Sequence, residues 1–286
     1  MITETHDEVG GISSRMLSVS GQAPPVLCLH GYSDSADTWR PVLTRLHAAG
    51  RSAYAVDLPG FGQAAGRRDG PLVAQFDEFV DSLLDRWATV VMLGNSLGAA
   101  TAVRAAARRP DRVVGLIALN DPLYARHWLA WLARTVTVPS WVWRAVGAIR
   151  VPRAPLPWVT RRALAQLLYG PGYTADRAVL DSWIEGYATW QAIAELGEGA
   201  FRYAREALGS HHGLQVSCPT AVVHGAHDRI IPVHASRTLA AQIPNAELTV
   251  LPRSGHCPQL DDPDAVVRII TEVIQRISTG HDRTGS

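Results

Sequence analysis

The chain has 286 residues, of which 47% are hydrophobic and 19% charged, a composition that indicates a globular protein and excludes a disordered one. Its 27 basic residues are all arginine and nearly balance 26 acidic residues, so the net charge of +1 argues against nucleic acid or an anionic membrane as the main partner. The absence of lysine, together with alanine-rich helical segments, points to a bacterial genome rich in G and C. Too few cysteines occur for a disulfide framework, and we expect buried thiols in a cytoplasmic protein: Cys28, Cys218 and Cys257.

Neither the start of the chain nor its most apolar stretch has the pattern of a targeting or membrane segment. Residues 1–8 carry acidic side chains and no basic region, unlike a signal peptide. Residues 128–149 are the most apolar stretch, but Arg134, Pro139 and Arg144 interrupt it, so we expect no transmembrane helix. An amphipathic face of this stretch toward lipid or a protein partner is an alternative.

Short apolar segments alternate with helical patterns along most of the chain. The apolar or β-branched segments predict strands at residues 26–30, 52–57, 89–93, 112–120, 220–224 and 247–251. The helical patterns cover residues 38–49, 72–87, 97–109, 234–243 and 263–277. Because strands that alternate with helices form parallel sheets, we predict an α/β fold with a mostly parallel central sheet and helices on both faces.

Residues 121–210 interrupt this alternation. The segment contains no clear strand, many prolines, and helical stretches at 161–168 and 175–190. We predict a helical cap over the carboxyl ends of the strands, inserted between a first core part, 1–120, and a second, 211–286. Seven of the nine tryptophans lie in it, and we expect some of them to line a large apolar pocket rather than only to fill a small core: Trp128, Trp131, Trp141, Trp143, Trp158, Trp183 and Trp190.

The strongest chemical motif is Gly94-Asn-Ser-Leu-Gly98, which lies between a predicted strand and a predicted helix. The two glycines permit a tight turn, and the turn exposes the hydroxyl of Ser96. The helix that begins at Leu97 directs its free N–H groups to the same place, where they favour negative charge. The motif in this context therefore predicts a nucleophilic serine.

A nucleophilic serine requires a base and an acid that orients it, which in this motif's setting are expected in the chain order Ser, Asp, His. Asp228 and His256 both follow predicted strands, so they lie at the same sheet edge as Ser96. Asp121, at the end of the strand 112–120, is an alternative acid. The histidines near Asp228 lack a third ligand in a metal-binding arrangement, and we expect neither metal nor cofactor: His224, His227 and His234.

With these residues in place, the chain resembles the α/β-hydrolase family over residues 26–278 apart from the insertion. Four motifs occur in family order: His30-Gly31-Tyr32, Asp57-Leu-Pro-Gly-Phe-Gly62, Gly94-Asn-Ser-Leu-Gly98, and Asp228 with Gly255-His256. The resemblance implies that Ser96 is the nucleophile, His256 the general base and Asp228 its orienting acid. It also implies an oxyanion hole made by the backbone N–H groups of Tyr32 and Leu97. In the family, a helical cap lies between the sixth and seventh strands of the sheet, and the insertion matches it.

These motifs together predict a serine hydrolase that cleaves a carboxylic ester with an apolar moiety. Serine at position 96 argues against the epoxide hydrolases and haloalkane dehalogenases, which use a carboxylate nucleophile. A hydrolase of carbon–carbon bonds in aromatic ring-cleavage products is a rival, but Leu97 replaces its usual methionine and no Gly-Pro follows His30-Gly31. Thioesterase and lactonase activities, and a ligand-binding receptor on the same fold, remain alternatives.

Several other side chains have simpler interpretations. We expect His30 to shape its loop through hydrogen bonds and Cys257 to be a packed thiol. His211 and His212 are expected on the solvated surface.

Overall fold

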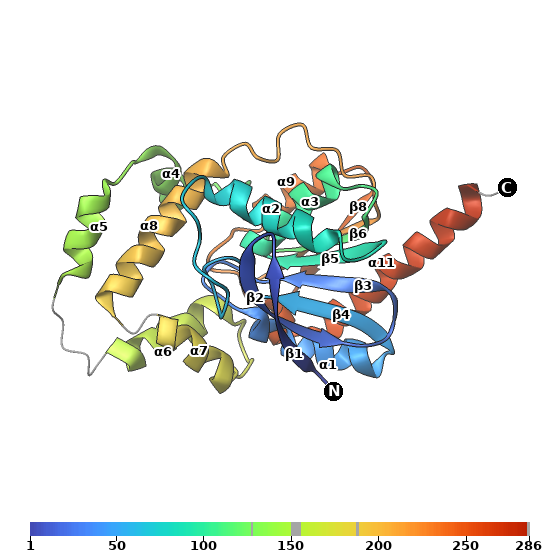
Figure 1. Ribbon diagram of the computed structural model, residues 1–286, viewed down its shortest axis with the longest axis horizontal. Coiled ribbons are helices and arrows are strands. Elements are labelled where there is room, and N and C mark those ends of the chain that lie inside the picture. The colour runs from blue at the N-terminus through green and yellow to red at the C-terminus, as the bar shows by residue number, and fades with distance from the viewer. Residues whose placement is uncertain (127, 150–155, 187–188, 285–286) are drawn as a thin grey trace.

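A computed structural model describes the chain except residues 127, 150–155, 187–188 and 285–286. Its centre is an eight-stranded sheet in the order β1-β2-β4-β3-β5-β6-β7-β8 (Figure 1). Strands β3 to β8 run parallel, whereas β2 is antiparallel to β1 and β4. The strands are β1 (Thr3–Val9), β2 (Ile12–Val19), β3 (Gln22–Leu29), β4 (Arg51–Val56), β5 (Val90–Asn95), β6 (Val113–Leu119), β7 (Thr220–Gly225) and β8 (Ala246–Leu251).

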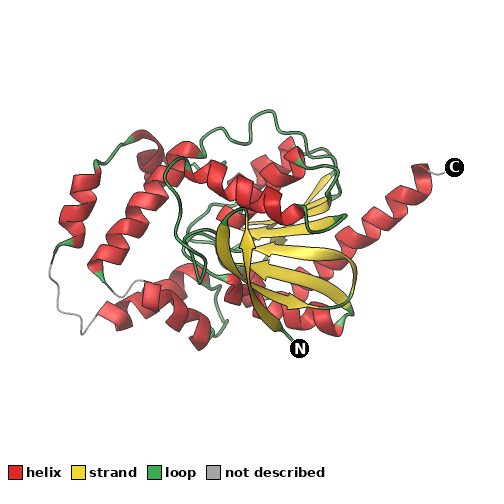
Figure 2. Cartoon of the chain, viewed as in Figure 1, coloured by secondary structure: helices red, strands yellow, loops and turns green. Residues whose placement is uncertain are grey.

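Helices cover both faces of this sheet, as the alternation of strands and helices predicts (Figure 2). Successive strand residues point to opposite faces, so Leu27 and Leu29 join one apolar cluster while Val26 and Cys28 join the other. Helices α2, α3 and α9 supply the first cluster, and α1 and α11 the second. These helices, with two short ones, are η1 (Ala36–Trp39), α1 (Arg40–Ala48), α2 (Leu72–Leu84), α3 (Leu97–Arg108), α9 (His234–Gln242), α10 (Pro258–Asp261) and α11 (Pro263–Thr284).

The hairpin β1–β2 precedes the first strand that the sequence predicts. Gly10 and Gly11 form its turn with φ of 55° and 76°, a conformation that glycine adopts at little cost. The hairpin adds two strands at the edge of the sheet farthest from β8.

In the part of the segment between β6 and β7 that the structure describes there are five further helices, which we call the inserted helices. Figures 1 and 2 show them grouped beyond one end of the sheet. Helix α8 packs against α4 and α5 and also contacts α2 of the core, while α6 packs against α7. The inserted helices are α4 (Trp128–Thr135), α5 (Ser140–Gly147), α6 (Leu156–Leu168), α7 (Arg177–Gly186) and α8 (Trp190–Glu206).

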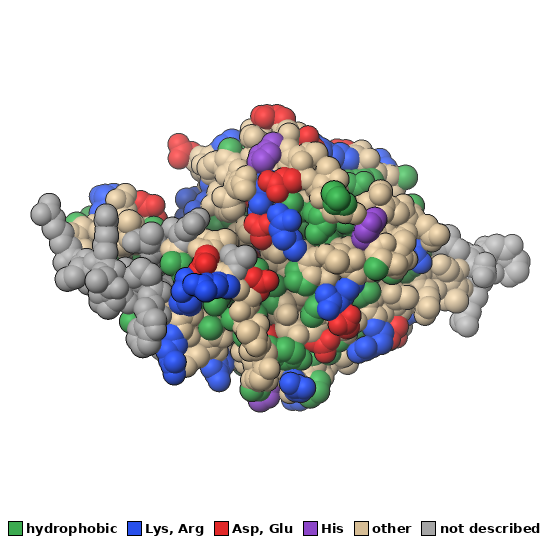
Figure 3. Space-filling view, turned by 90° about the horizontal axis from the view of Figure 1, so that it is seen from below, with side chains coloured by type: hydrophobic (Ala, Val, Ile, Leu, Met, Phe, Trp, Pro, Cys, Tyr) green, Lys and Arg blue, Asp and Glu red, His purple; other side chains and the backbone are tan. Residues whose placement is uncertain are grey.

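Charged side chains of both signs are intermixed on the face of the molecule in Figure 3. Many pair across elements, as Arg45 does with Asp264 at 2.6 Å. Within the described ranges, no helix combines the length and the apolar composition needed to cross a bilayer.

Candidate active site

Ser96 occupies a sharp turn between β5 and α3. Its φ of 53° is in the left-handed region, which costs a residue with a Cβ about 1–2 kcal/mol. The two glycines of the motif are required by close packing: a Cβ on Gly94 would lie 2.3 Å from the backbone of Gly98, and one on Gly98 would lie 2.2 Å from the carbonyl oxygen of Leu29. Larger residues would therefore push the turn away from β3.

His256 and Asp228 form a hydrogen-bonded pair at the same edge of the sheet. Nδ1 of His256 lies 2.7 Å from Oδ2 of Asp228. The other carboxylate oxygen, Oδ1, accepts the backbone N–H groups of Ile230 at 2.7 Å and Ile231 at 2.9 Å. Because the carboxylate is held from both sides, Nδ1 carries the proton that it donates to Asp228, and Nε2 is left as the basic nitrogen.

Ser96 and His256 line one cavity of about 290 Å³. Gly31 and Tyr32, from the loop after β3, form another part of its wall. Leu97 is the first residue of α3, where a backbone N–H has no acceptor within its own helix. The residues expected to form the nucleophile, the base and the oxyanion hole are thus adjacent.

Two buried asparagines hold the loop that carries His256. Asn95 Nδ2 and Asn120 Nδ2 each donate to the backbone oxygen of His256 at 2.9 Å. Asn120 also accepts the N–H of Gly225 at 2.9 Å, so it ties the end of β7 to the histidine loop. Asn120 has a φ of 51°. The only hint of this in the sequence is an asparagine at the end of a predicted strand, since asparagine tolerates the left-handed conformation. Neither side chain is among the site residues that the sequence predicts.

Asp121, the alternative acid, has a different partner. Its Oδ2 lies 3.2 Å from Nε2 of His211, and its Oδ1 accepts the N–H of Leu123 at 3.0 Å. The expectation that His211 is on the solvated surface is therefore wrong, because the residue is only 7% exposed and its ring packs against Tyr124. His212 is exposed, as expected.

The remaining histidines are engaged in local structure. His30 is buried, accepts the N–H of Leu58 at its Nε2 and contacts the carbonyl of Gly31 through Nδ1, which confirms its role in shaping the loop. His224 contacts Ser236 and the carbonyl of Ile231. Across the residues that the structure describes, no group of three or more His, Cys, Asp or Glu side chains is placed to hold a metal ion.

The motif at 57–62 organises the loops beside Ser96. Buried Asp57 accepts Nε of Arg15 at 2.9 Å, the N–H of Ala36 at 2.6 Å and the N–H of Gln63 at 2.8 Å. A Cβ on Gly62 would lie 2.4 Å from this carboxyl group, so glycine is required there. Asp57 thereby joins the loop after β4 to the loop after β3, which lines the Ser96 cavity.

Two inserted helices are attached to the loop after β3. The hydroxyl of Tyr32 donates to the carbonyl of Leu196 on α8 at 2.8 Å, and a Cβ on Gly199 would collide with this hydroxyl at 2.4 Å. The indole N–H of Trp183 on α7 donates to Oδ1 of Asp34 at 2.6 Å. The position of the inserted helices is thus linked to the loop that contributes Tyr32 to the site.

Burial raises the pKa of Asp34 to about 7, although the N–H groups of Ser35 and Trp183 favour its charged form. Since an exposed aspartate titrates near about 3.9, the folded state holds a proton that the unfolded state has lost between about pH 4 and 7. The contribution of Asp34 to the stability of the wild-type protein should therefore fall across this window as the pH rises. The substitution Asp34→Asn removes this titratable group. The free energy of unfolding of the variant, relative to that of wild type, should therefore increase toward the upper end of the window.

Urea denaturation of wild type and Asp34→Asn at about pH 5 and about pH 8 measures this difference. A difference in unfolding free energy that does not change with pH would contradict the shifted titration of Asp34.

A second cavity, of about 740 Å³, lies beside the Ser96 cavity and is mainly apolar. The two cavities share Leu167 and Ile230 as lining residues. Phe201 and Tyr203 of α8 are the aromatic residues in its described lining.

The tryptophans of the insertion have several different environments. Trp183 is buried and lines the smaller Ser96 cavity. None of the described tryptophans is among the lining residues of the large apolar cavity, where the sequence led us to expect some of them. Trp131 and Trp141 are each 64% exposed, and Trp143 packs against Phe201. The side chains of Trp128 and Trp158 lie outside those that the structure describes.

The sharp turn at Ser96, the pair of His256 with Asp228 and the mostly parallel sheet are together typical of the α/β hydrolase class of enzymes. The model of the alpha/beta hydrolase family matches residues 26–269, and the chain belongs to this family. It is similar to an esterase of Mycobacterium tuberculosis, with 29% identity over 93% of this chain and 87% of the relative. A pimeloyl-(acyl-carrier protein) methyl ester esterase of Nitrosomonas europaea is 25% identical over 90% of this chain and 98% of its own length.

Solved structures agree in fold. The 2-hydroxy-6-oxo-6-phenylhexa-2,4-dienoate hydrolase from Rhodococcus sp. strain RHA1 aligns with a TM-score of 0.77 over 96% of this chain and 99% of that one, at 24% identity. At this identity, the likeness concerns the fold alone.

Proposed function

We propose that the protein is a serine esterase that cleaves carboxylic esters with an apolar acyl group. One observation carries this proposal: Ser96, on a strained turn, shares a cavity with His256, whose Nδ1 lies 2.7 Å from Asp228. The similarity to named esterases supports the same reaction. No cofactor enters the mechanism.

In the proposed mechanism, Oγ of Ser96 attacks the ester carbonyl while Nε2 of His256 takes its proton. The negative charge that develops on the carbonyl oxygen is stabilised by the N–H groups of Tyr32 and Leu97, at about 3 kcal/mol for each donor. The bond from the acyl carbon to the alcohol oxygen then breaks, and His256 returns the proton to the leaving alcohol. Water repeats the sequence on the acyl-enzyme and releases the acid.

We assign residues 121–210 as a cap and residues 1–120 and 211–286 as the core. The inserted helices support this division, since they contribute Leu164, Leu167, Leu168 and Trp183 to the wall of the Ser96 cavity. We also retain a cytoplasmic location as part of the proposal, on the ground that the three cysteines are free.

The apolar cavity of about 740 Å³ is the proposed site of the acyl chain, because it adjoins the Ser96 cavity at Leu167 and Ile230. Carbon–carbon bond hydrolysis and thioesterase or lactonase activity require the same three residues and remain rivals within the class. A panel of p-nitrophenyl esters tests the proposal, with hydrolysis expected to become more efficient from the acetate to the octanoate. Absence of hydrolysis for every ester in the panel would contradict it.

The substitution Ala204→Trp places a large ring in the apolar cavity, since Ala204 of α8 lines it. We expect kcat/KM for the octanoate to fall by about 10-fold or more relative to that for the acetate, because the long chain loses its space. Steady-state kinetics on both esters measures this ratio. An unchanged ratio in a folded variant would show that the acyl chain lies elsewhere.

A further inference from the structure

A third cavity, of about 390 Å³, adjoins the Ser96 cavity on the side of the loop after β3. Ser33, Asp34 and Trp183 line both cavities. The large apolar cavity meets the Ser96 cavity elsewhere, at Leu167 and Ile230. The Ser96 cavity is therefore bordered by two other cavities, and each of them adjoins it at a different set of residues.

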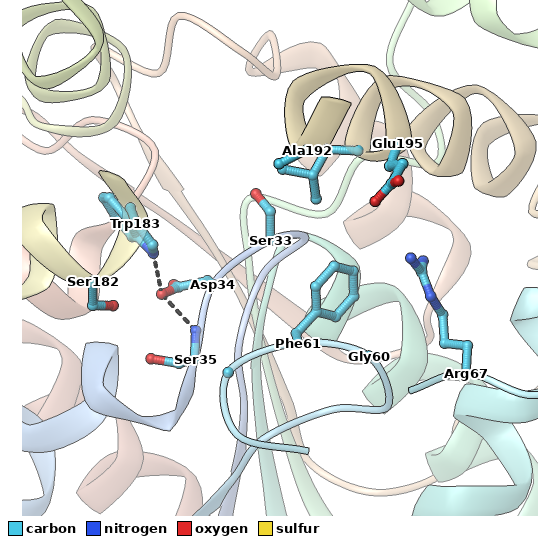
Figure 4. Close-up of a pocket in the computed structure, with 12 residues that line it drawn as sticks. Ser33, Asp34, Ser35, Gly60, Phe61, Arg67, Ser182, Trp183, Ala192 and Glu195 are labelled. Atoms are coloured by element: carbon cyan, nitrogen blue, oxygen red, sulfur yellow. Dashed lines mark hydrogen bonds between the residues drawn. The ribbon is translucent and has the colours of Figure 1, made fainter. Parts of the chain in front are cut away.

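The walls of this third cavity carry charges of both signs. Arg67, from the loop after β4, and Glu195, from α8, point toward one another beside the ring of Phe61 (Figure 4). The guanidinium carbon of Arg67 lies 5.1 Å from the centre of that ring, and Nη1 of Arg67 has no hydrogen-bond partner among the described residues. Glu195 accepts a hydrogen bond from Gln191 at 2.9 Å.

The cavity also offers hydroxyl groups and apolar ring surfaces. Ser33 and Ser182 lie on its walls together with the rings of Phe61 and Trp183 (Figure 4). Arginine only donates hydrogen bonds, ionised glutamate only accepts them, and serine does both. Aromatic rings supply apolar contact area for the C–H groups of a ligand.

This combination disfavours a ligand that carries charge of one sign only. An anion attracted to Arg67 would also approach Glu195, and a cation attracted to Glu195 would also approach Arg67. An uncharged group with several hydroxyls satisfies both walls, because each hydroxyl donates one hydrogen bond and accepts others. Its carbon skeleton would contact the ring of Phe61.

We propose that this third cavity is a subsite for an uncharged, polyhydroxylated leaving alcohol, so that the substrate is an apolar acyl ester of glycerol or of a sugar. The inference rests on the proposed esterase function and specifies its alcohol. The acyl chain occupies the apolar cavity, the ester carbonyl lies at Ser96, and the hydroxyls of the alcohol bind Arg67 and Glu195.

Three substrates with one acyl chain test the proposal: 1-octanoylglycerol, 6-O-octanoylglucose and ethyl octanoate. Released octanoate is measured for each. We expect wild type to prefer at least one hydroxylated ester over the ethyl ester by about 10-fold or more in kcat/KM. Whichever of the glycerol and glucose esters has the higher kcat/KM identifies the alcohol that the subsite binds. Equal kcat/KM for all three would overturn the subsite while leaving the esterase intact.

Arg67→Met and Glu195→Gln should each lower this preference by about 10-fold. The first removes a charged donor to the alcohol, and the second replaces a charged acceptor by a neutral amide. Arg68→Met is the matched control, because Arg68 contacts Glu78 and the carbonyl of Gly10 instead, and it should retain the wild-type preference. A preference that neither Arg67→Met nor Glu195→Gln changes would overturn the proposal. Failure to hydrolyse any octanoyl ester would instead contradict the proposed function.

Discussion

Ser96→Ala is expected to lower kcat/KM for p-nitrophenyl octanoate by about 10⁵-fold or more, because no other oxygen takes the place of the nucleophile. The fold should be retained. The side chain of Ser96 makes no capping hydrogen bond to α3, and alanine meets the same strain as serine at a φ of 53°. Hydrolysis rates of the purified variant measure the loss of activity, and thermal denaturation measures whether the fold is retained.

A covalent probe provides a second measurement of the same role. A fluorophosphonate should add its mass to wild type and not to Ser96→Ala. Ser82→Ala is the matched control, since the hydroxyl of Ser82 on α2 donates to the carbonyl of Glu78 at 2.9 Å, and this variant should be labelled as wild type is. Residual activity of Ser96→Ala above about 1% of wild type would exclude the serine mechanism, because loss of a nucleophile costs far more than this.

Asp228→Asn is expected to lower kcat by about 10⁴-fold through the wrong histidine tautomer. The N–H groups of Ile230 and Ile231 both require an acceptor, so the amide oxygen must take the place of Oδ1. The amide nitrogen then faces Nδ1 of His256 and donates to it. The histidine proton moves to Nε2, which can no longer accept the proton of Ser96.

Asp121→Asn is the matched substitution at the other candidate acid. Asp121 faces His211 rather than His256. The activity of the Asp121→Asn variant should therefore remain within about 3-fold of wild type, as expected for a residue that does not contact Ser96 or His256. Initial rates of both variants, with circular dichroism to verify folding, decide between the two carboxylates. A larger loss for Asp121→Asn than for Asp228→Asn would assign the acid to Asp121.

Much of the fold could be predicted because its signals are local. The apolar segments alternate with helical patterns, and the resulting mostly parallel sheet appears as β3 to β8. The hairpin β1–β2 was not predicted. Its strands are partly exposed, and its signal is limited to Gly10-Gly11 and to alternating burial on either side.

The candidate site divides in the same way. The turn at Ser96 is recognisable in the sequence because two glycines and a serine between a strand and a helix suit a conformation that larger residues would exclude. Asn95, Asn120 and Asp34 could not be assigned, because their roles depend on partners distant in the chain. Asn120, for instance, contacts the carbonyl groups of Gly255 and His256.

Local patterns in the chain are therefore enough to predict the parallel sheet, the tight turn at Ser96 and the set of residues that could act beside it. Periodic burial and backbone strain depend on residues that are close together in the sequence, so local patterns can predict them. The folded structure was needed to show that Asp228 is the carboxylate that faces His256 and that His211 is buried against Asp121. It was also needed to show that Trp183 borders the site while Trp131 and Trp141 face solvent. Those outcomes depend on how separate segments pack, since hydrogen bonds and cavities form between side chains that no local pattern relates.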